Sequence, residues 1–276
     1  MENEQFFFTR HSKKPKGEDL ESSEFKGISE KGVELARERS KEMLDGLDKS
    51  EDGTVMLIGG ASEVPRTKAT AMVYGQEIKN IITEQKRDDV LVFLPEDLAG
   101  IDGFTNKINF LAQQVKANPD KKIVLDFPLF LKEFSLKDRW TEADGSLKSY
   151  TDELLKRNNY NEETAMRDWF ENRGRIGDLV GPNPKEVAEE QMKGIARLRE
   201  FAKKHFSDRP LIIGSVGHSW NLDALAVYLA NDGEISKELF EKMNSTLIED
   251  AGMIKIENKN GSQILKYGNI DIPLED

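Results

Sequence analysis

With 276 residues the chain is long enough for one large domain, and its lack of cysteine excludes disulfides, thiolate nucleophiles and cysteine-bound zinc. A net charge of −11 disfavours nucleic acid and acidic membranes as partners, because both bind broad basic surfaces, so any anion site must be local. The start Met1–Gln5 lacks a signal-peptide pattern, and no apolar run approaches the roughly 20 residues of a membrane span, so we expect a cytoplasmic protein.

The first predicted element is a buried strand built on three consecutive aromatic residues, Phe6–Phe8. The basic stretch Thr9–Lys14 follows it and sets His11 between cations. Ligands of open α/β sheets bind just beyond the carboxyl ends of such strands. We therefore expect this stretch to form a catalytic loop.

A helix and a second strand come next. Apolar residues at helical spacing predict an amphipathic helix over 28–47, which opens at Ser29. Residues 54–58 predict a second buried strand, closed by two glycines. Arg66 stands near the start of a further helix predicted over 67–82, so a second cation follows a strand end.

Acidic residues follow the third predicted strand, which covers residues 90–94. Glu96 and Asp97 come directly after it, ahead of a glycine-containing loop. The pattern of polar residues just beyond a buried strand is thus repeated, here with carboxylates in place of cations.

The periodic pattern loosens from about residue 104 to residue 181. Helix-like pieces occur at 106–116 and 162–170, and Trp140 and Trp169 stand among many charges. We interpret this region, about 104–181, as an inserted, mainly helical cap with the two tryptophans in its small core.

The second half of the chain returns to regular alternation. Residues 183–186 resemble a helix opening with an N-cap and a proline at the first position, and the long helix that follows ends before Arg209. A fourth buried strand covers 211–216, and His218 follows it ahead of a helix predicted over 220–229. The second key histidine thus also follows a strand.

The fold class follows from this alternation of strands and helices. Two runs at 252–256 and 263–267 predict a closing hairpin. No repeat or low-complexity linker divides the chain, so we expect a single α/β domain over 1–276. We expect three layers: a mostly parallel sheet with helices on both faces, interrupted by the mainly helical cap.

Several of these motifs resemble those of the histidine phosphatase superfamily, which includes the cofactor-dependent phosphoglycerate mutases. Thr9–Ser12 resembles its Arg-His-Gly signature, and residues 62–71 are similar to its segment of serine, small residues and arginine before a Thr-Ala helix. Residues 28–32 resemble its Leu-Thr-x-x-Gly helix opening, and 217–219 resemble its late histidine motif. Leu94–Glu96 is similar to the segment that supplies the acid in one branch. The resemblance implies a phosphoglycerate mutase-like fold.

Two departures from the family pattern concern residues beside the histidines. Ser12 stands where the family has glycine, which crowds the backbone next to the phosphate. Ser219 follows His218 where the family has glycine or aspartate. Neither departure removes a reactive group.

The resemblance implies metal-independent hydrolysis of phosphomonoesters through a phosphohistidine on His11. Arg10 and Arg66 would hold the phosphoryl oxygens, since a guanidinium offers a fork of donors that matches an oxyanion. Lys14 would add a further cation, although a solvated loop lysine is an equal alternative. No metal and no cofactor are implied.

Two further roles follow from the same resemblance. His218 would donate to a phosphate oxygen in the transition state, best in its protonated form. Glu96 would protonate the leaving oxygen, with Asp97 as a competitor for that role. The expected partner is a small phosphorylated substrate or a phosphopeptide, and the sequence leaves the oligomeric state open.

Alternatives remain at this point. A mutase would return the phosphoryl group to another oxygen of the substrate, and a binding or regulatory module would keep the pocket without turnover. A serine hydrolase is disfavoured because Ser215 lacks the glycine two residues before it that a nucleophile elbow needs. A metal site that uses His11, His218 and a carboxylate is opposed by the two cations next to His11.

Overall fold

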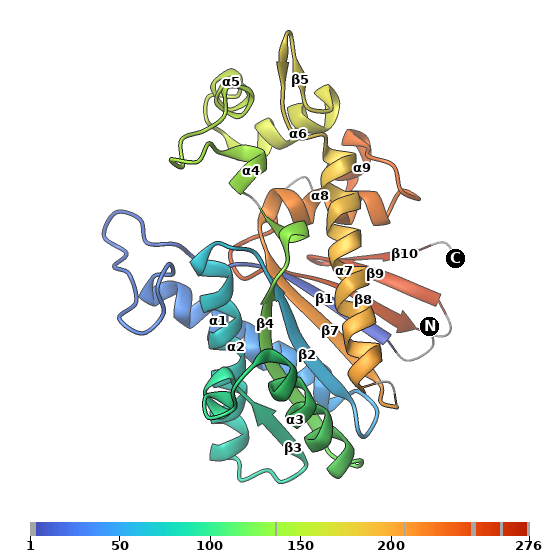
Figure 1. Cartoon of the computed structure of the whole chain (residues 1–276). Helices are drawn as coiled ribbons and strands as arrows, with labels where there is room; N and C mark the ends of the chain where they lie inside the picture. Colours follow the sequence, from blue (N-terminus) through green and yellow to red (C-terminus); the bar gives the residue numbers. More distant parts are fainter. Residues whose placement is uncertain (1–3, 136, 207, 244–246, 260–261, 275–276) are drawn as a thin grey trace.

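The computed structural model describes residues 4–135, 137–206, 208–243, 247–259 and 262–274. A mixed sheet of eight strands lies at the centre of this part of the chain, in the order β10-β9-β8-β1-β7-β2-β4-β3 (Figure 1). In chain order these strands are β1 Glu4–Arg10, β2 Val55–Ala61, β3 Val90–Phe93, β4 Lys122–Phe130, β7 Leu211–Gly217, β8 Met253–Lys259, β9 Ser262–Tyr267 and β10 Ile270–Pro273.

Five adjacent strands of this sheet, β1, β7, β2, β4 and β3, run parallel to one another, whereas β8 pairs antiparallel with β1. Every residue of β2 and β7 is buried, as expected for strands that are covered on both faces. The carboxyl ends of the five parallel strands therefore lie along one edge of the sheet, and the loops that follow them share that edge.

Helices cover both faces of the sheet. On one face α1 (Glu30–Asp48) and α2 (Pro65–Glu84) share a core with Phe7, Met56 and Ile58. The other face carries a second core, to which three helices contribute: α3 Phe104–Ala117, α7 Pro184–Phe206 and α8 Ser219–Leu229. The predicted three-layer α/β fold is confirmed. Among the described residues, no helix is both long and apolar enough to cross a membrane.

The cap is smaller than the sequence predicts. Residues 104–130 do not belong to it, because α3 packs on the sheet and β4 pairs between β2 and β3. The remaining segment lies beyond the carboxyl ends of the parallel strands (Figure 1). Its elements are η2 Lys132–Phe134, α4 Lys137–Trp140, α5 Ser149–Arg157, α6 Glu162–Asn172 and the two-stranded β5 Arg175–Ile176 and β6 Leu179–Val180. The short elements η1 Pro95–Leu98 and α9 Lys237–Lys242 complete the described set.

Three tryptophans join the cap to the sheet domain. Trp140 on α4 and Trp169 on α6 have ring centroids 4.9 Å apart, and both belong to the large core on one face of the sheet and not to a separate small core of the cap. Trp220 at the start of α8 completes the cluster, at 5.0 Å from Trp140 and 5.5 Å from Trp169. The position of the cap above the sheet edge is thus fixed by aromatic packing against the helix that follows β7.

Candidate active site

The loop after β1 is held against two helices. The backbone N–H of Ser12 donates to Thr70 Oγ1 on α2 at 2.9 Å, and its own hydroxyl donates to the carbonyl of Gly32 on α1 at 2.5 Å. A Cβ at position 32 would collide with the carbonyl of Lys13, so glycine is needed for this approach. The hydroxyl of Ser12 is thus engaged by α1, and Ser12 is not among the residues that line the cavity described below.

His11 is buried and keeps one ring nitrogen free. Its Nδ1 lies 2.8 Å from the carbonyl of Ser12, so Nδ1 carries the proton and donates it, which leaves a lone pair on Nε2. Burial, together with the nearby cations Arg66, Arg10 and Lys14, lowers the pKa of His11 to about 3. At neutral pH the side chain is therefore an uncharged imidazole, the form that a nitrogen nucleophile requires.

The rings of His11 and His218 lie edge to face with centroids 5.1 Å apart. The register of the sheet explains this contact, because Arg10 on β1 is the partner of Gly217 on β7 and the next residue of each strand is a histidine. Burial lowers the pKa of His218 well below its usual value, with further contributions from His11, Arg66 and Arg10. The protonated His218 that the sequence led us to expect is thus not the form present in the free site.

Ser62 is a partner of His218 for which the sequence predicted no role. Its hydroxyl oxygen lies 2.8 Å from Nε2 of His218 and 3.1 Å from Oγ1 of Thr67. Ser62 directly follows β2, the neighbour of β7, and both side chains are buried. The sequence signal for Ser62 was its place in the segment before Arg66. Its contact with His218 joins residues that are far apart in the sequence, so the sequence did not reveal it.

Arg66 lies at the second position of α2, against the helix dipole. Cations are disfavoured there, so the position indicates an anion site at that helix end. Within the described part of the chain its guanidinium has no hydrogen-bond or ion-pair partner, and its Nε is buried. Burial and the neighbouring Arg10 lower the pKa of Arg66 below its usual value. A bound anion would offset both the unfavourable interaction of Arg66 with the helix dipole and the cost of burying its charge beside Arg10.

Arg10 is held in place by the loop before β8. Its Nη1 donates to the carbonyl of Ile248 at 2.7 Å, and its Nη2 lies 3.1 Å from the carboxylate of Asp250. Asp223 on α8 anchors this loop, because its Oδ1 accepts from Ile248 N at 3.1 Å and from Tyr267 Oη at 2.6 Å. Burial raises the pKa of Asp223 to about 7. The sequence signal for Asp223 is a single charged residue in α8, which is otherwise uncharged and mostly apolar.

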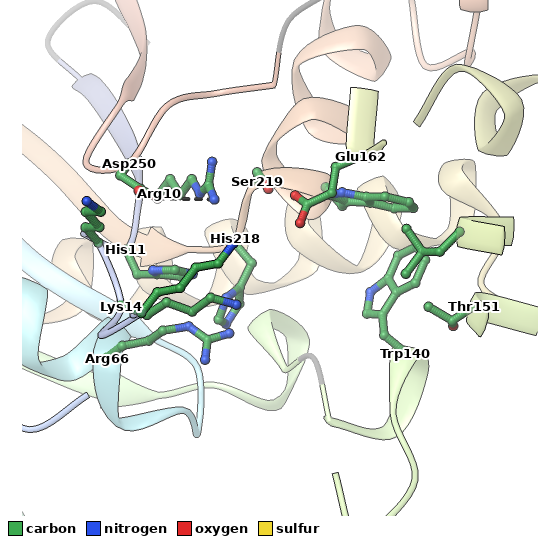
Figure 2. A pocket seen from close by; sticks show the side chains of 14 residues that line it. Arg10, His11, Lys14, Arg66, Trp140, Thr151, Glu162, His218, Ser219 and Asp250 are labelled. Atoms are coloured by element: carbon green, nitrogen blue, oxygen red, sulfur yellow. Dashed lines mark ion pairs between the residues drawn. The ribbon is translucent and has the colours of Figure 1, made fainter. Parts of the chain in front are cut away.

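These side chains share one cavity of about 410 Å³. Figure 2 shows Arg10, His11, Lys14, Arg66 and His218 gathered on one side of it and Trp140 and Thr151 on the other. The full lining consists of Arg10, His11, Lys13, Lys14, Lys16, Arg66, Trp140, Thr151, Leu155, Glu162, His218, Ser219, Trp220 and Asp250. Five basic residues line a cavity in a chain of net charge −11, as a local anion site requires.

Glu96 and Asp97 lie outside this cavity. They belong to η1 after β3, and β4 separates β3 from β2, so they are two strand spacings, about 10 Å, from the end of β2. Glu96 is exposed, and Asp97 is 2.7 Å from Lys79 Nζ. The expectation that one of them protonates the leaving group therefore has no support in their positions.

No group of three or more His, Cys, Asp or Glu side chains that could hold a metal ion occurs in the described part of the chain. The five predicted residues around the phosphate, Arg10, His11, Lys14, Arg66 and His218, do come together at the sheet edge. Of the predicted site residues, Glu96 and its alternative Asp97 are left out. The arrangement offers a neutral nitrogen nucleophile beside several cations.

Comparisons with known proteins give similarity at the level of structure alone. No protein-family model matches the chain, and no curated protein matches it. A mycobacterial glucosyl-3-phosphoglycerate phosphatase is similar with 11% identity, a TM-score of 0.47 and coverage of 92% of this chain and 90% of that one. A putative alpha-ribazole-5'-P phosphatase from Escherichia coli is similar with 13% identity, a TM-score of 0.41 and coverage of 98% of this chain and 96% of that one. A phosphoserine phosphatase mutant from Entamoeba histolytica, in complex with phosphoserine, is similar with 13% identity, a TM-score of 0.45 and coverage of 96% of this chain and 95% of that one.

Proposed function

We propose that the protein is a metal-independent phosphatase of the histidine phosphatase superfamily, which hydrolyses phosphomonoesters through a phosphohistidine on His11. The observation that carries the proposal is the geometry at the ends of β1 and β7. There a neutral His11 with a free Nε2 stands against His218, within a ring of cations. The proposal rests on this geometry and not on the distant structural neighbours.

In the first step Nε2 of His11 attacks phosphorus, and the bond between phosphorus and the alcohol oxygen breaks. The guanidinium groups of Arg10 and Arg66, with the ammonium of Lys14, would hold the non-bridging oxygens and stabilise the charge of the transition state. In the second step water attacks phosphorus, the bond to Nε2 breaks, and inorganic phosphate leaves.

The state of His218 depends on whether phosphate is bound. In the empty site it is neutral, because burial and the surrounding cations disfavour its charge. A phosphate dianion in the cavity supplies the opposite charge and would raise the pKa of His218, so that the ring can donate to a phosphate oxygen. Ser62 fixes the plane of the ring for this contact through its hydrogen bond to Nε2.

The test of the proposal is hydrolysis of p-nitrophenyl phosphate in the presence of a metal chelator. We expect turnover by the wild type, and a loss of at least about 10³-fold in His11→Ala, since the nucleophile is then missing. His205→Ala is the matched control, because this histidine lies near the end of α7 and does not line the cavity. Full activity of His11→Ala would overturn the assignment.

Chemical quench separates the proposed phosphatase from the alternatives. A phosphohistidine is labile in acid and stable in alkali, so label trapped on the protein should be lost on acidification. A mutase would return the label to a second oxygen of the substrate instead of releasing phosphate. Binding of orthovanadate without turnover of any ester would favour a binding module.

A further inference from the structure

The proposed reaction lacks one group, a proton donor for the leaving oxygen. An alkoxide is a poor leaving group, and a positioned acid typically contributes 10²–10⁴-fold to its departure. Within the described residues, the carboxylates that line the cavity are Asp250 and Glu162. Asp250 forms an ion pair with Arg10, so Glu162 is the carboxylate that remains for this task.

The backbone of Glu162 is fixed over the cavity. Glu162 is the first residue of α6, and the N-cap Asn161 accepts from the backbone N–H groups of Glu163 and Thr164, both at 3.0 Å. Trp169 anchors the same helix, because its ring is fully buried and its Nε1 donates to the carbonyl of Pro182 at 2.6 Å. The backbone of α6 at Glu162 therefore has a defined position, from which the exposed Glu162 side chain extends.

The side chain of Glu162 points into the cavity. Figure 2 shows its carboxylate between the phosphate-side residues and the indole of Trp140, directed toward Ser219 and His218. No hydrogen bond or ion pair engages this carboxylate within the described part of the chain. The leaving-group end of the cavity has an apolar lining, formed by Trp140, Leu155 and Trp220. The next residue, Glu163, does not line the cavity.

From this placement we propose that Glu162 is the general acid and base of the reaction, an inference that rests on the proposed function. Its carboxyl proton passes to the bridging oxygen as the O–P bond breaks and the bond from Nε2 of His11 to phosphorus forms. The carboxylate then takes a proton from water as the water oxygen bonds to phosphorus and the N–P bond breaks. This restores the carboxyl group and free His11.

The proposal also defines a substrate class. Esters of ordinary alcohols need the proton, whereas nitrophenolate leaves without one. The natural substrate is therefore a phosphomonoester of an ordinary alcohol, whose alkoxide is too basic to leave without a proton. The carbon skeleton of this alcohol lies along Trp140 and Leu155 on the cap.

The experiment compares leaving groups of similar shape and different basicity: p-nitrophenyl, phenyl and benzyl phosphate. In Glu162→Gln we expect kcat/KM for benzyl phosphate to fall about 10²- to 10³-fold, and for p-nitrophenyl phosphate less than about tenfold. The rate should then depend more steeply on leaving-group basicity than in the wild type. Glu163→Gln is the matched control and should leave all three rates unchanged.

Either of two outcomes in Glu162→Gln overturns the inference. An equal loss for all three esters indicates a role in binding or charge, and unchanged rates indicate no role in the reaction. The proposed function is tested separately, by wild-type turnover of p-nitrophenyl phosphate and its loss in His11→Ala. If both hold while the dependence on leaving group is unaltered, the assignment of Glu162 alone fails.

Discussion

The two walls of the cavity are built in different ways. On the sheet side, His11 and His218 follow two neighbouring strands whose register places them opposite each other, and both are buried. On the cap side, Trp140 and Glu162 stand on separate helices that are joined to the sheet domain by packing of aromatic rings. The sheet wall is thus set by backbone hydrogen bonds between strands, and the cap wall by side-chain contacts.

This difference suggests that the sheet wall carries out the chemistry at phosphorus and that the cap wall recognises the alcohol. Groups that act on phosphorus need fixed distances, and adjacent parallel strands supply them because the strand spacing is nearly constant. Groups that meet the alcohol must differ between substrates, and helices held by side-chain packing can be altered without disturbing the strands. Substitutions on the sheet wall should therefore affect every ester alike, whereas substitutions on the cap wall should change the order of preference among esters.

Among the cations of the sheet wall, the largest effect should come from Arg66→Ala. Loss of one preorganised charged donor to a transition-state oxyanion typically costs 10²–10³-fold in rate, and we expect that loss in kcat/KM for every ester tested. Lys68→Ala on the exposed face of the same helix is the control. Steady-state kinetics with aryl and alkyl phosphates measures the effect. A loss confined to one ester would break the proposed division between the walls.

The sequence predicts most of this site because the site residues directly follow buried parallel strands. The continuous apolar runs of β1, β2 and β7 predict buried parallel strands, and the residues after them, His11, Arg66 and His218, lie where such strands place ligands. The three-layer fold and most helix boundaries follow from periodicity in the same way. The local sequence pattern is therefore sufficient to predict both the fold and the site residues on the sheet side.

The failures concern contacts between distant parts of the chain. In β4 the apolar run is interrupted by Asp126 and Pro128, so it reads as part of a charged insertion. The prediction of Glu96 rests on its place after a strand and on the resemblance of Leu94–Glu96 to a family segment, but β4 lies between β3 and β2 and keeps the end of β3 away from the site. The contribution of Glu162 depends on how the cap packs, and no local pattern in the sequence reveals that packing.

Burial of His11 should make the stability of the protein depend on pH. Its pKa in the folded state, about 3, lies below the ordinary 6.5, so the unfolded chain binds the proton first as the pH falls. The wild type should lose up to about 1.4 kcal/mol of unfolding free energy per pH unit below 6.5, relative to His11→Ala. Urea titrations of both proteins at pH 7 and pH 5 test this. A constant difference between them would show that His11 is readily protonated in the folded state.

The smallest effect on p-nitrophenyl phosphate should come from the cap, through Trp140→Phe. The ring packs on two other tryptophans, and phenylalanine keeps an aromatic side chain there while removing the indole N–H, which has no partner within the described residues. We expect hydrolysis of p-nitrophenyl phosphate to change less than about threefold, and the ratio of rates for two bulkier alkyl phosphates to change by about tenfold. Phe110→Leu, which removes an aromatic ring from α3 at a position that packs against the core and does not line the cavity, controls for packing and should leave that ratio unaltered. Equal losses for all esters in Trp140→Phe would mean that the cap positions the phosphate as well, and the two walls would then act as one.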